Sequence, residues 1–418
     1  MDRMEYYENS PMINRYEKVM CFSKTEMERR FALVRKVMEE QGTDVLLVLE
    51  GFWEGYSQWL IGNRTPSVII VPREGPITAV FGNEFLAKGE KPSEELLTER
   101  ATDLLMPEPV HPDIVYVRGL DGYGIGQLLD SYQNQRLGFL HLESMTQGMK
   151  TYLKEAAPKA EYVDIALALD AVKGVKSPEE MELIRNAVVI HEKVMEAMPS
   201  IIRPGRTIQQ INLEARYLIH QLGSGTEECL AFSIQFGNDR KGPLCHHSGL
   251  APYPERAVEK GDRVFMLLES NGIGGHFTAL GRNFCLGEPD RETQKYWELC
   301  LKMQDFAAER LKPGAVIREI FDENVKYIES LGYRTNRQNY LHSLGYVLGE
   351  KPYLHDPSET IPLKENMVYL NHPHVRIDRG ADTGKVVYDD LYAIDTYRVT
   401  KEGGVRQNKI PRELIVIE

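Results

Sequence analysis

The stretch that decides the fold is Val258–Phe284, which has the sequence VEKGDRVFMLLESNGIGGHFTALGRNF. Its first arm, Arg263–Ser270, is an apolar run that carries a single acid, Glu269. Asn271 and Gly272 then open a glycine-rich turn, and this dipeptide is typical of β-hairpins because both residues tolerate positive φ. The stretch therefore predicts a long β-hairpin with one acidic side chain on its first strand.

The length and charge of the chain limit the classes of protein to which it can belong. A chain of 418 residues favours two or three domains. Its hydrophobic fraction of 42%, with 21 Tyr and 13 Phe, supports sizeable cores and argues against disorder. The formal charge of −12 disfavours a nucleic-acid or anionic-membrane partner, because neither phosphate nor lipid would be attracted. We therefore expect a globular protein with sizeable cores and no nucleic-acid or membrane partner.

Cysteine usage and the first residues indicate the compartment. The five cysteines are odd in number, widely spaced and without a CxxC pair, which favours reduced thiols over a disulfide framework. The first 25 residues contain no apolar segment of the signal-peptide kind, and no run of about 18 apolar residues occurs anywhere. These features predict a cytoplasmic protein.

The first part of the chain alternates helical and strand-like segments. Helical periodicity runs from Thr25 to Gly42, and glycine is a natural helix C-cap. Short β-rich runs follow, separated by Gly and Pro: DVLLVLE, SVIIVPR, ITAVFGN and RLGFLHLE. Strands that alternate with helices predict an α/β domain over residues 1–172.

A second domain, residues 173–418, begins with a clear helix start. Ser177 offers an N-cap, Pro178 fixes the first helical φ, and Glu180 completes a capping box. An apolar stripe at helical spacing follows: Met181, Ile184, Val188 and Met195. We therefore expect a long amphipathic helix at the start of this domain.

The second domain contains an internal repeat. Pro204-Gly205 and Pro313-Gly314 lie 109 residues apart, and each follows a helical segment. The residues that match at equal offsets are Ile208 and Ile317, Ile211 and Ile320, and Leu222-Gly223 and Leu331-Gly332. A strand pair follows each copy, at 263–284 and 367–399. Two such units bury their apolar faces across a pseudo-twofold axis, with helices outside and strands inside, so we expect a site between two hairpins.

These motifs together resemble the creatinase, prolidase, aminopeptidase P and methionine aminopeptidase superfamily. The resemblance rests on KSPEEMELIRNAVVIHE, the two Pro-Gly helices, VEKGDRV, HFTALGRNF, LHSLG and DTYRVTKEGG, and on RRFALVRKVMEEQGTDVLLVLEG in the first domain. It implies an α/β (α+β) protein with a creatinase-type N-terminal domain. A C-terminal pita-bread domain, a duplicated αβ unit with a pseudo-twofold axis, would follow. It also implies a homodimer, because creatinase-type N-terminal domains usually pack against a partner chain.

Metallopeptidases of this superfamily bind two metals through two Asp, one His and two Glu. The resemblance places these ligands at Leu267 or Leu268, Ala279, His342, His372 and Ile394. Leu, Ala and Ile cannot ligate a hard divalent cation, so a dinuclear carboxylate site is not expected. The carboxylates implied by the resemblance to metal-free creatinase are also replaced, by Gly281 and again by His372. Creatine is therefore not the expected substrate.

Histidines are the strongest candidates for chemistry, because one imidazole can take up and return a proton near pH 7. The predicted catalytic residues are His342, His246, His247 and His372. The predicted substrate contacts are Glu269, His276, Arg282, His374, Arg376 and Tyr392. Each histidine could instead be a hydrogen-bonded structural residue, and each arginine part of a structural salt bridge. The hairpin is one residue longer than the superfamily motif, which is why the first ligand position falls at Leu267 or Leu268. Glu269 faces the site only if this extra residue lies beyond it, and the sequence leaves both placements open.

These residues lead to a first functional hypothesis, a metal-independent creatinase-like hydrolase that needs no cofactor. It would cleave a C–N bond of a small zwitterionic or amide-type substrate through histidine acid-base chemistry. Three alternatives remain. The first is a catalytically inactive pita-bread protein that binds a ligand, as histone-chaperone relatives with this fold do. The second is an Xaa-Pro-type metallopeptidase. The third is a hydrolase whose zinc or iron is held by His342, His372 and His374.

Overall fold

The computed structural model describes most of the chain in two compact units. The described residues are 22–49, 55–62, 68–81, 111–118, 129, 132–224, 227–235, 257–272, 274–333, 341–354, 356–378 and 388–418. The units divide between Lys173 and Gly174. This division lies next to the boundary predicted after residue 172, and the assignment of two separately folding domains stays a prediction.

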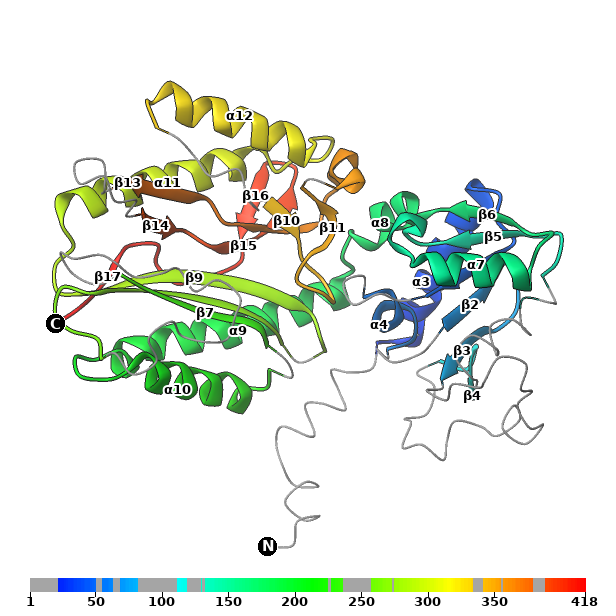
Figure 1. The fold of residues 1–418 in the computed structure, drawn as a ribbon, viewed down its shortest axis with the longest axis horizontal. Helices are drawn as coiled ribbons and strands as arrows, with labels where there is room; N and C mark the ends of the chain where they lie inside the picture. The colour runs from blue at the N-terminus through cyan, green and yellow to red at the C-terminus, as the bar shows by residue number, and fades with distance from the viewer. Residues whose placement is uncertain are drawn as a thin grey trace, which may run out of the picture. The chain divides into compact units, whose positions relative to one another are not determined.

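The N-terminal unit is built on a six-stranded mixed sheet with the order β4-β3-β2-β1-β5-β6. Its strands are β1 (Val45–Val48), β2 (Val68–Pro72), β3 (Ile77–Phe81), β4 (Ile114–Arg118), β5 (Arg136–Phe139) and β6 (Glu161–Asp164). Its helices are α3 (Lys24–Glu40), α4 (Tyr56–Ile61), η2 (Leu142–Ser144), α7 (Gln147–Ala156) and α8 (Ala166–Lys173) (Figure 1). The alternation of strands and helices confirms the predicted α/β class for this part of the chain.

Local sequence explains the elements of this unit. The Ser23 side chain accepts a hydrogen bond from the Glu26 backbone N–H and so caps α3. β1 is buried along its whole length, as expected for a central strand of a sheet covered on both faces. It pairs antiparallel with β2 and parallel with β5, so the strand-rich runs of the sequence meet at the centre of the sheet.

The C-terminal unit repeats one arrangement twice, as the sequence predicted. The first copy contributes α9 (Pro178–Ile201) and α10 (Ile208–Gln221), and the second contributes α11 (Arg291–Arg310) and α12 (Ile317–Ser330). Figure 1 shows the two helix pairs on opposite sides of the unit with the strands between them. The capping box of α9 is present, since the Ser177 and Glu180 side chains each bond the other residue's backbone N–H. None of the described helices is long and apolar enough to cross a membrane.

Two sheets fill the space between these helices. The first sheet has the order β17-β9-β8-β7 and comprises β7 (Glu227–Gln235), β8 (Arg263–Asn271), β9 (Phe277–Leu286) and β17 (Ile415–Ile417). The second has the order β11-β10-β12-β15-β16 and comprises β10 (Leu341–Ser343), β11 (Glu350–Tyr353), β12 (Val368–Asn371), β15 (Asp395–Thr400) and β16 (Gly403–Arg406). A separate ribbon joins β13 (His374–Asp378) to β14 (Tyr388–Tyr392), and η3 (Pro357–Thr360) is a short 3₁₀ turn.

The opening stretch forms the hairpin β8–β9, as predicted. Its antiparallel ladder runs without a register shift from Arg263 opposite Cys285 to Asn271 opposite Phe277. The hairpin also joins the second copy, because the Gly281 N–H donates to the Ile394 carbonyl at 3.0 Å. The hairpin therefore has one face toward the first helix pair and the other toward the second copy.

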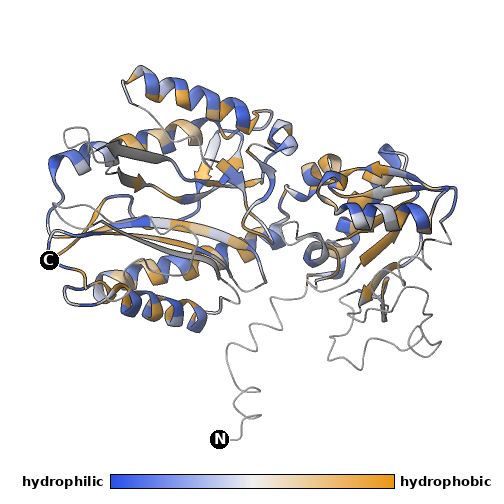
Figure 2. Cartoon of the chain, viewed as in Figure 1, coloured by the Kyte–Doolittle hydropathy of each residue, from blue (hydrophilic) through white to orange (hydrophobic). Residues whose placement is uncertain are grey.

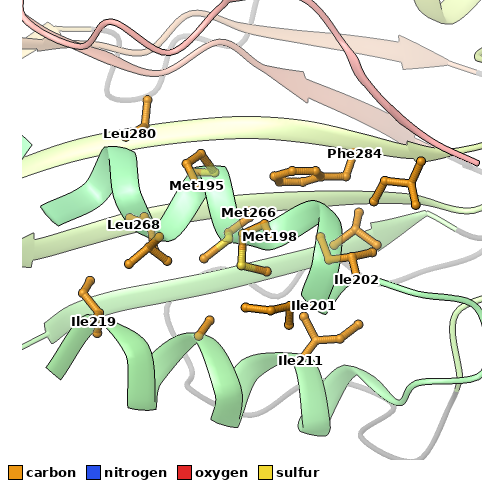
Figure 3. Close-up of a cluster of buried hydrophobic side chains, with 14 of the residues drawn as sticks. Met195, Met198, Ile201, Ile202, Ile211, Ile219, Met266, Leu268, Leu280 and Phe284 are labelled. Atoms are coloured by element: carbon orange, nitrogen blue, oxygen red, sulfur yellow. The ribbon is translucent and has the colours of Figure 1, made fainter. Parts of the chain in front are cut away.

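The outer face of the hairpin packs on α9 and α10. Met266, Leu268, Leu280 and Phe284 project from the strands into a cluster with Met195, Met198, Ile201, Ile202, Ile211 and Ile219 (Figure 3). Hydrophobic and hydrophilic residues both occur along α10 and α12, as in amphipathic helices that cover a core (Figure 2). Even residue numbers on β8 thus belong to the outer face, which leaves the odd numbers for the inner face.

One buried histidine fixes α9 to this hairpin. The His191 Nε2 atom lies 2.8 Å from the Ser270 hydroxyl, and Nδ1 lies 3.1 Å from the Thr278 hydroxyl. Burial lowers the pKa of His191 to about 3, so the imidazole is neutral at pH 7. Both ring nitrogens therefore have a hydroxyl partner, which is how a buried neutral histidine is accommodated.

The hairpin turn approaches α9 so closely that only glycine fits. A Cβ at Gly272 would lie 2.7 Å from the Cα and Cβ atoms of Ala187. We expect Gly272→Ala to lower the free energy of unfolding by about 1–3 kcal/mol, because it forces the turn away from the helix. Urea unfolding measures the change. The matched control is Gly148→Ala in α7, where nothing lies within 4 Å of the added Cβ. Equal stability of the two variants would contradict the close approach.

Candidate functional site

The inner face of the hairpin is apolar at the positions that correspond to the metal ligands of the superfamily's metallopeptidases. Leu267, Ala279 and Ile394 belong to one buried cluster. The other members of this cluster are Met181, Ile184, Phe265, Leu344, Val368, Leu370 and Tyr392. Leu268 belongs instead to the outer cluster, which identifies Leu267 as the residue at the first ligand position. The space between the hairpins is therefore packed with hydrocarbon side chains at these points.

Gly281 and Ile394 fit one another sterically. A Cβ at Gly281 would lie 2.9 Å from the Ile394 Cβ and Cδ1 atoms. The Ile394 side chain thus occupies the volume that a larger residue at 281 would need. Glycine at 281 and isoleucine at 394 therefore depend on one another: the isoleucine fills the space that an acidic side chain at 281 would need.

The donor set does not fit the two-metal centre that the resemblance implies. Hard divalent cations are bound by carboxylate, carbonyl and water oxygens, and Leu267, Ala279 and Ile394 offer no side-chain donor. Within the described ranges, no group of three or more His, Cys, Asp or Glu side chains is arranged to hold a metal ion. The zinc or iron alternative includes His374, whose side chain is not among those described, and it stays a prediction.

His342 lies on β10 and is almost fully buried. Its Nδ1 atom is 3.1 Å from the Ser343 carbonyl oxygen, which can only accept a hydrogen bond. In the neutral ring Nδ1 therefore carries the proton, which makes Nε2 the acceptor nitrogen. Burial lowers the pKa of His342 to about 4, although the carbonyls of Ser343 and Leu348 act in the opposite direction. At pH 7 this imidazole is a neutral proton acceptor.

Two further side chains lie against His342. The Tyr353 ring stacks on it with a centroid distance of 5.2 Å and an interplanar angle of 27°. The His372 ring meets it edge-on, also at 5.2 Å. The structure thus brings together two of the predicted catalytic histidines. Tyr353 was missed, because its position opposite His342 depends on β11, a strand that the sequence did not reveal.

Glu269 faces the same region, which resolves the question that the sequence left open. It pairs with Ala279 across the hairpin and, like Leu267, has an odd number on β8, so it lies on the inner face. Tyr353 has a raised pKa, first because of burial and second because of the negative charge of Glu269. The carboxylate therefore lies within electrostatic range of Tyr353, whose ring stacks on His342. We name the four residues Glu269, His342, Tyr353 and His372 the histidine–tyrosine cluster.

Arg282 makes contacts of a structural kind. Its guanidinium donates to the Asp395 carboxylate at 2.7 Å and to the carbonyls of Pro411 at 2.8 Å and Ile394 at 2.9 Å. The side chain is fully buried. These contacts match the salt-bridge alternative for Arg282, and a substrate contact of this residue stays a prediction.

His276 and Tyr392 also lie in packed surroundings. The His276 Nε2 atom is 3.7 Å from the Glu180 carboxylate, and its ring is 4.0 Å from that of Tyr346. Burial lowers the pKa of His276, with Glu180 opposing the shift. Tyr392 stacks on Phe265 at 5.0 Å within the inner apolar cluster. The contacts described for both residues are with packed neighbours, and their substrate roles stay predictions.

The remaining predicted residues cannot be placed fully. His246 and His247 lie outside the described residues. The backbone of β13 pairs His374 with Tyr392 and Arg376 with Asp390. The side chains of His374 and Arg376 also lie outside the described part of the chain, so their predicted roles stay open.

A buried ion pair holds the turn that follows His342. Lys176 and Glu350 bond one another, and both side chains are almost fully buried. The Glu350 carboxylate also accepts the Tyr346 backbone N–H at 3.3 Å and lies directly over Gly345, where any Cβ would overlap it. Sequence inspection missed this pair, since its members are far apart along the chain. Its effect is to fix the segment between His342 and Tyr353.

The duplicated helices and hairpins define the class of protein, which is a pita-bread fold. Comparison with known proteins identifies the family: the profile of metallopeptidase family M24 matches residues 182–406, more than half of the chain. The chain therefore belongs to metallopeptidase family M24, which confirms the resemblance found in the sequence.

Individual relatives are distant. An Xaa-Pro dipeptidase of Pyrococcus furiosus is 26% identical over 273 residues, covering 65% of this chain and 74% of the relative. A creatinase of a Bacillus species is 26% identical over 319 residues, covering 72% and 70%.

Solved structures share the fold. Dipeptidase PepE of Mycobacterium ulcerans has a TM-score of 0.73 at 20% identity, covering 95% of this chain and 99% of that one. The prolidase of Pyrococcus horikoshii has a TM-score of 0.71 at 20% identity, covering 93% and 100%. The N-terminal domain of the FACT complex subunit SPT16 from chickpea has a TM-score of 0.69 at 13% identity, covering 95% and 100%.

Restoring a single carboxylate should destabilise the protein without creating a metal site. We expect Leu267→Asp to lower the free energy of unfolding by about 3–5 kcal/mol, because an unpaired charge enters an apolar cluster. Addition of Mn²⁺ or Co²⁺ should not recover the loss, since Ala279 and Ile394 provide no second ligand. Urea unfolding with and without metal measures both effects. Leu267→Met, a nearly isosteric control, should cost less than about 1.5 kcal/mol. Recovery of stability on metal addition would refute this account.

The low pKa of His342 also makes a prediction about acid stability. The pKa falls from 6.5 in the unfolded chain to about 4 in the folded one, so between these values only the unfolded chain binds the proton. The stability contribution is complete above pH 6.5 and is lost as the pH falls toward 4. His342→Gln should reduce the slope of stability against pH in this window by up to about 1.4 kcal/mol per pH unit. Unfolding measured across the window tests this, and an unchanged slope would place His342 in a more polar environment.

Proposed function

We propose that this protein hydrolyses the amide C–N bond of a small peptide of the Xaa-Pro class, with His342 as the general base. The family assignment supports a hydrolase of peptide or amide bonds. The substrate class follows relatives that are named Xaa-Pro dipeptidase. They make a peptide a better-supported substrate than the small zwitterion of the first hypothesis.

The observation that carries the proposal is the state of His342. Its Nδ1 proton is committed to the Ser343 carbonyl, so Nε2 is the atom that can accept a proton from water. The ring is held in place by Tyr353 on one side and His372 on another. A neutral, oriented imidazole beside a partly exposed histidine is a suitable base for the attack of water on an amide carbon.

The proposed chemistry uses this chain's own residues. M24 relatives of the prolidase type usually use divalent metals, but the apolar residues at positions 267, 279 and 394 do not fit that centre. We therefore propose that water is activated by His342, with His372 and Glu269 positioning the substrate. Glu269 supplies a negative charge on the inner face, which suits the ammonium end of a dipeptide.

Turnover of alanyl-proline tests the proposal. The wild-type protein should hydrolyse this dipeptide in the presence of EDTA, and His342→Ala should lower kcat at least about 10²-fold while leaving thermal unfolding nearly unchanged. His220→Gln is the control, since His220 lies on α10 and bonds the Ser224 carbonyl. Turnover that requires Mn²⁺, Co²⁺ or Zn²⁺ would reject the metal-free chemistry and favour a metal-dependent peptidase.

A second candidate function is ligand binding without catalysis. The packed apolar cluster at the ligand positions favours it, because those residues stabilise the fold and cannot activate water. The fold similarity to the SPT16 domain shows only that a pita-bread chain of this architecture occurs within a larger complex. Calorimetry with alanyl-proline separates the two candidates: binding of a dipeptide that is recovered intact supports the binding protein, and release of proline supports the hydrolase.

A further inference from the structure

Tyr353 is the residue of the histidine–tyrosine cluster to which no role has yet been given. It lies directly opposite His342 in the antiparallel ladder of β10 and β11, so both side chains leave the same face of the sheet. Leu370, which is opposite His342 on the other side, belongs to the inner apolar cluster, which shows that this face is the inner one. Tyr353 and His342 therefore project together toward the hairpin β8–β9.

The side chains of Tyr353 and His342 differ in length and in the hydrogen bonds that they can form. They stack with an interplanar angle of 27°, and the tyrosine, which is the longer side chain, carries a hydroxyl at its end. The Tyr353 phenol carries its proton at neutral pH, as any ordinary tyrosine does, and can donate a hydrogen bond. His342 is neutral at the same pH and can accept one. A donor and an acceptor thus stand side by side, both uncharged.

This pairing matches the needs of an amide that is attacked by water. We propose that Tyr353 is a second catalytic residue, whose hydroxyl donates a hydrogen bond to the carbonyl oxygen of the scissile amide and stabilises the oxyanion that forms there. The inference rests on the proposed hydrolysis and names the atom that each residue contacts. It also implies that the recognised group is an uncharged amide, because neither partner carries a charge that would select an ion.

The step balances without any additional reactant. The oxygen of water bonds to the amide carbon while its proton moves to Nε2 of His342, and the carbonyl π electrons become the oxyanion held by the Tyr353 hydroxyl. The C–N bond then breaks as the carbonyl reforms, and the proton on His342 passes to the leaving nitrogen. Tyr353 keeps its proton throughout, so it acts by hydrogen bonding alone.

Tyr369 supplies a matched comparison within the same sheet. It lies opposite Ser343, one position along the ladder from His342, so its side chain leaves the other face. Its pKa is also raised by burial. Replacing either tyrosine by phenylalanine removes one phenol hydroxyl from the same sheet. Only the Tyr353 hydroxyl is on the inner face, so Tyr369→Phe is the matched control.

The test compares Tyr353→Phe with Tyr369→Phe, using alanyl-proline as substrate and its phosphinic analogue as a mimic of the oxyanion. Tyr353→Phe keeps the ring stack and should lower kcat by about 10²-fold with little change in KM. It should also weaken binding of the phosphinic analogue by a similar factor while binding of the dipeptide changes little. Tyr369→Phe should leave both quantities unchanged.

The outcomes separate this inference from the proposed function. If the wild-type protein turns over alanyl-proline and Tyr353→Phe has the same kcat, the role of Tyr353 is overturned and the proposed hydrolase function is retained. Absence of turnover, together with analogue binding that depends on the Tyr353 hydroxyl, overturns the hydrolase but supports the hydrogen bond to the oxyanion. Absence of both turnover and analogue binding overturns both.

Discussion

The buried ion pair of Arg282 and Asp395 is the constraint on which the catalytic-type unit depends. Arg282 comes from the first copy of the duplicated unit and Asp395 from the second, and both are excluded from solvent. The Asp395 carboxylate also accepts a hydrogen bond from the Gln304 side chain on α11, so the same carboxylate also holds the second helix pair. Removing Arg282 would leave Asp395 with only the longer ion pair to Arg406 at 3.5 Å, and removing Asp395 would leave the Arg282 guanidinium with carbonyl acceptors alone. Either loss inside the protein costs far more than the loss of a surface pair. This link fixes how the two hairpins face one another, and hence where any site between them can form.

The region between the hairpins combines two different environments. Around Leu267 and Ile394 the region is filled with hydrocarbon side chains, and their packing joins the two copies. These are the positions that correspond to the metal ligands of the superfamily's metallopeptidases. Toward Glu269 and His342 the region becomes polar, with rings that remain neutral because burial disfavours their charged forms. This part of the scaffold therefore combines the uncharged rings of His342 and Tyr353 with the Glu269 carboxylate, beside an apolar wall.

The sequence was informative where local rules apply. The Asn271-Gly272 turn predicted the hairpin, the Ser177 capping box predicted α9, and the Pro-Gly repeats predicted the duplicated arrangement. The sequence was uninformative where the pairing register between distant strands decides which side chains meet. The ladder of β10 and β11 shifts between His342 and Ser343, and nothing in the residues near Tyr353 signals that shift. The face of Glu269 likewise depended on where the extra hairpin residue lies, and only the pairing with Ala279 settled it. Arg282 illustrates the same limit, because its acceptors at Asp395 and Pro411 are more than a hundred positions away.

The contact between Gly281 and Ile394 also bears on the history of the chain. Their atoms compete for one volume, so an ancestor with a larger residue at 281 could acquire isoleucine at 394 only after that residue had shrunk. The reverse path is blocked in the same way, since a side chain at 281 is tolerated only once 394 has become smaller. The two positions therefore constrain the order in which they can change, and a side chain cannot be regained at 281 in a single substitution while Ile394 is present.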